Sequence, residues 1–169
     1  MKNVFLAIAA FTVIAATGPS YAQQTTTKDQ LVGTWRVISL KATSGDKVSR
    51  PLGEQVAGYV TITPDRFWLL FIDSTRKAPV AATLTDAEAV AMMKSHVAWT
   101  GKYSTAEQTP EGLKVTAKVD AASSQAIAGT DRVYFMRVDG NKLVVKSPGV
   151  IVPMTGATSV VEFELVKAD

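Results

Sequence analysis

Residues 56–72 read VAGYVTITPDRFWLLFI, and this stretch decides the fold class. Both of its halves are rich in Val, Ile, Thr and aromatic residues, which favour extended strands. Only Pro64 and Asp65 separate residues 56–63 from residues 66–72, and proline presets the backbone angle φ that a tight turn requires. We therefore expect two neighbouring antiparallel strands joined by a short hairpin.

The same composition recurs on both sides of this hairpin. One further strand is expected at residues 31–40, and five more at residues 98–105, 113–119, 132–138, 142–147 and 159–166. Apolar and polar side chains alternate along several of them, as in a sheet with one face in water. Eight such strands can form a sandwich or an antiparallel up-and-down barrel, and closure removes exposed edges. We expect an all-β protein with an eight-stranded barrel, just wide enough for one small ligand.

One α-helix interrupts the strands, at residues 85–96, between the third and fourth of them. Thr85 and Glu88 have the Thr-x-x-Glu spacing of a capping box, which satisfies the first free amides of a helix. His96 stands at the end where the helix dipole favours positive charge, so we expect it to bond the helix terminus. Residues 67–72 are apolar on both faces, and the helix is expected to cover their outer side, with an intermolecular contact as the alternative.

The N-terminus has the pattern of a secretory signal peptide. An apolar run at residues 4–16 follows a lysine, and residues 1–22 end on small residues that predict cleavage near Ala22. The run is shorter than the roughly 20 residues that cross a bilayer. Residues 23–30 are expected to form a flexible leader and residues 31–169 the barrel domain. The sequence thus predicts a periplasmic or secreted protein without a stable membrane anchor.

Composition excludes several kinds of site. The chain has 169 residues, a net charge of +3, no cysteine and one histidine. A disulfide scaffold, a thiolate zinc site and a cysteine nucleophile are therefore excluded. The Gly-rich nucleotide motifs and the Gly-x-Ser-x-Gly elbow do not occur, and the basic residues are scattered singly. We predict no catalytic residue, no metal, no cofactor and no nucleic-acid partner, and the oligomeric state stays open.

Several ordered blocks of sequence carry a family pattern. They are LVGTWR (31–36), RPLGE (50–54), GYVTITPD (58–65), GKY (101–103), GTDR (129–132) and DGNKL (139–143). Together they resemble the bacterial lipocalin-like domain family, and the Gly-x-Trp of the first block is similar to the signature of calycin barrels. The resemblance implies a barrel closed at one end, with Trp35 at its base and an internal pocket. Relatives set an arginine against this tryptophan; here Phe163-Glu164-Leu165 stands at that place, and Lys167 or Arg36 is expected to substitute.

Strand alternation also selects the residues that face the interior. We predict five ligand-binding residues: Trp99, Tyr103, Arg132, Tyr134 and Phe163. An arginine on an otherwise apolar strand face is costly unless it is paired. Arg132 therefore reaches solvent or a neighbouring acid, or it meets an anionic group of the ligand; a shifted strand register is the third reading.

Three functions are compatible with these features. The first is an exported protein that binds a small hydrophobic or amphipathic molecule inside the barrel. The second is an enzyme of the isomerase or cyclase type acting on a small apolar substrate. The third is an interaction module with a filled barrel, which a solid interior would favour. The apolar segment at residues 148–158 is either a lid over the barrel mouth or a buried connection.

Overall fold

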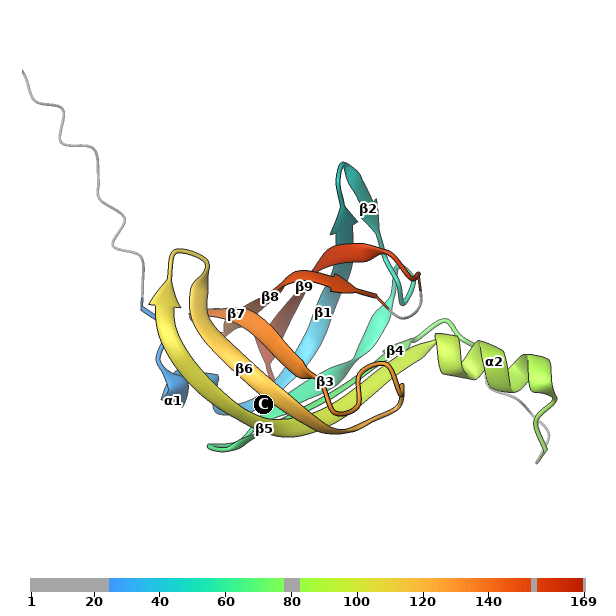
Figure 1. Ribbon diagram of the computed structural model, residues 1–169, viewed down its shortest axis with the longest axis horizontal. Helices are drawn as coiled ribbons and strands as arrows, with labels where there is room; N and C mark the ends of the chain where they lie inside the picture. The colour runs from blue at the N-terminus through green and yellow to red at the C-terminus, as the bar shows by residue number, and fades with distance from the viewer. Residues whose placement is uncertain (1–24, 78–82, 153–154, 169) are drawn as a thin grey trace, which may run out of the picture.

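The computed structural model describes residues 25–77, 83–152 and 155–168 (Figure 1). Its strands are β1 (Gly33–Ser44), β2 (Lys47–Ser49), β3 (Val56–Ile62), β4 (Arg66–Asp73), β5 (His96–Thr109), β6 (Gly112–Ala122), β7 (Asp131–Asp139), β8 (Lys142–Ile151) and β9 (Thr158–Lys167). Every pairing is antiparallel, and β9 returns to pair with β1. The predicted eight-stranded up-and-down barrel is therefore confirmed, built by β1 and β3 to β9.

The hairpin expected at residues 56–72 is present as β3 and β4. Their register runs from Val56 opposite Asp73 to Ile62 opposite Phe67. At the turn, the Thr63 amide donates to the Arg66 carbonyl at 2.9 Å. The proline turn therefore joins two directly paired strands, as the sequence predicts.

A short additional strand, β2, changes the numbering of the elements. It pairs with the far end of β1, with Ala42 opposite Ser49, and extends the β1 hairpin beyond the barrel (Figure 1). The predicted helix is α2 (Asp86–Lys94), which therefore lies between β4 and β5. Its capping box is confirmed: the Thr85 amide donates to Glu88 Oε2 at 2.9 Å. This bond and the Thr85 hydroxyl hold the pKa of Glu88 below its ordinary value.

The expectation that α2 covers the outer side of β4 is wrong. The helix extends away from the barrel (Figure 1), and none of its residues is buried. Trp68 is 49% exposed and Leu70 is 50% exposed on the uncovered strand face. The physical reason is that residues 89–93 are all apolar, so apolar side chains surround the helix instead of forming one stripe that docks on a sheet. His96 does bond the helix end, because its Nδ1 donates to the Met92 carbonyl at 2.8 Å.

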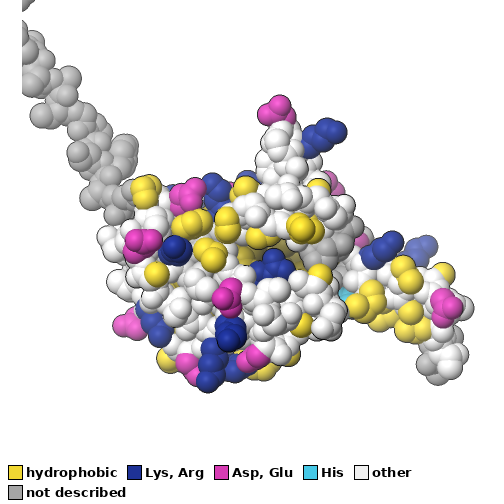
Figure 2. Space-filling model, viewed as in Figure 1, with side chains coloured by type: hydrophobic (Ala, Val, Ile, Leu, Met, Phe, Trp, Pro, Cys, Tyr) yellow, Lys and Arg dark blue, Asp and Glu magenta, His cyan; other side chains and the backbone are white. Residues whose placement is uncertain are grey.

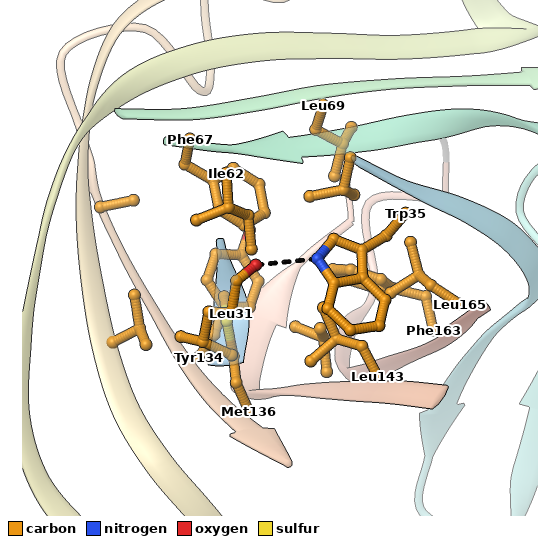
Figure 3. Close-up of a cluster of buried hydrophobic side chains, with 14 of the residues drawn as sticks. Leu31, Trp35, Ile62, Phe67, Leu69, Tyr134, Met136, Leu143, Phe163 and Leu165 are labelled. Carbon is orange, nitrogen blue, oxygen red and sulfur yellow. Dashed lines mark hydrogen bonds between the residues drawn. The ribbon is translucent and has the colours of Figure 1, made fainter. Parts of the chain in front are cut away.

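One end of the barrel, here called the base, is filled and closed. Trp35 is 1% exposed, and its Nε1 donates to the Leu31 carbonyl at 2.8 Å (Figure 3). Leu31 belongs to a second helix, α1 (Lys28–Leu31), which the sequence analysis missed. Thr26 is also buried, and its Oγ1 accepts a hydrogen bond from the Val138 amide at 3.0 Å. The residues expected to form a leader therefore include, from Thr26 to Gln30, one buried side chain and most of the short helix α1.

A lysine lies at the base where the resemblance implies an arginine. Lys167 Nζ lies 4.3 Å from the centre of the Trp35 ring system and donates to the Val32 carbonyl at 2.7 Å. Arg36, the other candidate, is exposed on the outer face of β1. A cation over an aromatic face is attracted by the electron-rich ring. Lys167 therefore performs at the base what the resemblance assigns to an arginine.

Candidate functional site

The half of the barrel opposite the base contains a cavity of about 90 Å³. Val138 bonds the base, so Arg132, near the other end of β7, lies toward the opposite end, here called the mouth. Figure 2 shows a hollow on the face in view, with a Lys or Arg side chain in it and hydrophobic side chains around it. The barrel interior is therefore not solid. Its half next to the base is packed, and its half next to the mouth contains the cavity.

Aromatic rings form one wall of this cavity. Trp99 lines the cavity, and its ring is stacked against Tyr134, at 6.0 Å between ring centres, and against Phe67, at 4.8 Å; Phe67 and Tyr134 are themselves 6.1 Å apart. The planes of Trp99 and Tyr134 differ by only 4°, whereas Phe163 meets the Tyr134 ring edge-on at 74°. Such stacked and edge-on pairs hold one another in place. The wall is therefore a rigid apolar surface, suited to an apolar part of a ligand.

Three polar side chains interrupt the apolar lining: Arg132, Tyr134 and Ser147. Arg132 Nε is fully buried and has no hydrogen-bond partner among the described residues. Ser147 Oγ accepts a hydrogen bond from the Val161 amide at 3.0 Å. Burial raises the pKa of the Tyr134 hydroxyl well above its ordinary value, and the nearby Arg132 charge opposes this by a smaller amount. Tyr134 is therefore a neutral hydroxyl at any physiological pH.

The structure brings four of the five predicted site residues together. Trp99, Arg132, Tyr134 and Phe163 all line the cavity. Tyr103 faces inward on the same strand as Trp99 but lies outside the lining. Its hydroxyl donates to the Thr63 carbonyl at 2.9 Å. Alternation thus predicts the correct strand face, and the depth along the strand separates Tyr103 from the site.

Sequence reasoning missed lining residues that come from loops and strand ends. Ile127 is 4% exposed and closes one side of the cavity, although residues 121–129 read as a small, polar loop. Ile127 is a single large apolar residue in this loop, and this feature of the sequence could have indicated that it packs inward. Val150 and Val152 also line the cavity, and Val152 is buried, so this part of the apolar segment packs inward. Residues 153–154 of that segment lie outside the described residues.

The described part of the chain contains no cluster of three or more His, Asp or Glu side chains able to hold a metal ion. None of its helices is long and apolar enough to cross a bilayer.

Comparison with known proteins identifies the family. A comparison with curated proteins found no match, and a comparison with solved structures found none either. The lipocalin-like domain matches residues 32–166, which is nearly the whole barrel. Sequence pattern, barrel closure and base architecture agree with this match. The chain therefore belongs to the lipocalin-like domain family.

Proposed function

We propose that this chain is exported and binds one small hydrophobic or amphipathic molecule inside its barrel. The observation that carries the binding proposal is the aromatic-walled cavity, because an apolar pocket with a few placed polar groups is the usual form of a small-molecule site. Family membership supports it, since the fold suits ligand binding in general. The signal-peptide pattern of residues 1–22 supports export to the periplasm or the medium.

Cavity size limits the ligand. A water molecule needs roughly 10–15 Å³ of such volume, and an engineered cavity of roughly 150 Å³ binds benzene. A cavity of about 90 Å³ therefore holds a short alkyl chain or part of a ring. A larger molecule would have to extend through the mouth.

The same size sets the expected affinity. Burying one methylene group contributes about 0.8 kcal/mol, so five of them contribute about 4 kcal/mol. Before the cost of association is subtracted, this free energy corresponds to a Kd of about 1 mM. Contacts with the ring wall and with polar groups would add to it.

A titration with hexan-1-ol tests the binding proposal. The readout is the indole N–H resonance of Trp99 in a two-dimensional NMR spectrum, assigned with a Trp99→Phe variant. We expect a saturable shift of this resonance, with little change at the exposed Trp68. The probe is neutral, so the result depends on the apolar cavity and not on its charge.

A cavity-filling variant supplies the control. Val161 lines the cavity, and a Val161→Phe substitution is expected to remove the saturable shift because the larger ring occupies the space. Val160→Phe makes the same change on the same strand at a residue outside the lining and should leave it. Absence of saturation in the unmodified protein, or equal effects of the two variants, would contradict interior binding.

A further inference from the structure

We propose that the natural ligand of this cavity is a small carboxylate, whose head group bonds Arg132 at the mouth while its short apolar tail lies against the ring wall. This inference rests on the proposed function and names the class of ligand that the site takes. It is carried by an arginine that the described fold buries in part and leaves without an acceptor.

Arg132 has unused donors. Its Nε is fully buried and unpartnered, and none of the ion pairs found among the described residues includes Arg132. A buried donor without an acceptor costs free energy, and a buried cation without an anion costs more. In the folded protein the Arg132 Nε–H therefore lacks an acceptor, and a bound anion would supply one.

The described surroundings of Arg132 supply hydroxyl groups but no acidic side chain. The described lining of the cavity contains no Asp or Glu. Tyr134 is a neutral hydroxyl, for which we find no hydrogen bond among the described residues. Ser147 Oγ already accepts from the Val161 amide, so its own O–H is left to donate. Three donor groups and no acidic side chain fit a group that only accepts.

Among such groups, a carboxylate fits this geometry best. The planar guanidinium offers parallel N–H bonds that match the two oxygens of a carboxylate. A phosphate would bring a second negative charge and a third peripheral oxygen. The described lining carries only one cation, and the cavity is only about 90 Å³, so a phosphate fits less well than a carboxylate.

The position of Arg132 on its strand determines the orientation of the ligand. Arg132 lies near the mouth end of β7, Tyr134 lies two residues deeper, and Met136 is completely buried below them. The head group therefore stays at the mouth, where water completes its solvation, and the tail points toward the base. Because the core closes at Met136, the tail must be short.

Two probes with the same tail test the inference. Hexanoate and hexanamide differ in charge but have nearly the same shape, and their Kd values are measured by the Trp99 NMR titration described above. We expect hexanoate to bind at least tenfold more tightly than hexanamide, as expected for a charge-assisted bond in place of a neutral one. An Arg132→Leu substitution should remove this preference and leave measurable hexanamide binding, because it removes the guanidinium and not the apolar cavity.

The matched control is Arg137→Leu, which makes the same change on the same strand but on its exposed face. This variant should retain the hexanoate preference. Thermal unfolding of each variant verifies that it is folded. If hexanamide binds and hexanoate binds no better, or if Arg132→Leu retains the preference, the carboxylate inference is wrong while interior binding stands. If neither probe binds, both proposals fail together.

Discussion

Replacing Trp35 with alanine is expected to lower the free energy of unfolding by about 3–5 kcal/mol. Trp35 is 1% exposed at the centre of the base, so the substitution leaves a large hole among Leu31, Leu143 and Leu165 (Figure 3). It also removes the hydrogen bond from the indole to the Leu31 carbonyl and the ring beneath Lys167. Urea denaturation followed by circular dichroism measures the change.

Trp68→Ala is the matched control for this prediction. Trp68 is 49% exposed on the outer face of β4. The Arg66 guanidinium lies over its ring, with Cζ 5.6 Å from the ring centre. Removal of the Trp68 ring opens no interior space, so we expect a loss of about 1 kcal/mol or less. Equal losses for the two tryptophans would show that Trp35 does not organise the base.

Gly58→Ala is expected to destabilise the barrel by about 3 kcal/mol. Gly58 has a φ of 140°, which residues with a side chain rarely adopt, and a Cβ at this position would overlap the Leu70 carbonyl oxygen on β4. Both obstacles are backbone features that cannot move without separating β3 from β4. Thermal unfolding and urea denaturation of the purified variant measure the loss.

Gly149→Ala provides the comparison for Gly58→Ala. Gly149 has no positive φ, and the nearest atom to an added Cβ is Thr158 Cγ2 at 3.5 Å, an ordinary contact. We expect a change within about 0.5 kcal/mol. If Gly58→Ala were equally harmless, the close approach of β3 and β4 would not be a constraint on this position.

The barrel itself was predictable from the sequence, because its strands alternate and are short and sequential. The period of two identifies which side chains face inward, and Trp99, Tyr134 and Phe163 were placed in this way. Alternation carries no information about depth along a strand. Tyr103 has the same inward orientation as Trp99 but bonds the Thr63 carbonyl outside the cavity.

Other features depend on contacts between distant residues. The burial of Thr26 rests on a bond to Val138, 112 residues later in the chain, and local composition at residues 23–30 cannot reveal it. The position of α2 is a different case, because its continuous apolar run predicts a helix but no particular docking face. Ile127 lines the cavity because the loop that follows β6 brings it there, and local composition does not indicate this.

At the base, a lysine makes the contacts for which the resemblance implies an arginine. Lys167 satisfies the Val32 carbonyl and the face of Trp35 with one ammonium group. One ammonium group therefore makes both basal contacts. Arg132 differs, because its role in our proposal depends on the paired donors of a guanidinium, which lysine lacks.

A crystal structure of the protein under xenon pressure tests interior binding most directly, since xenon enters dry apolar cavities without needing any polar contact. We predict a strong density peak inside the barrel, in the cavity of about 90 Å³ that the rings of Trp99, Tyr134 and Phe163 line. A barrel interior without xenon density would contradict the account, whether or not xenon occupied the exposed face at Trp68.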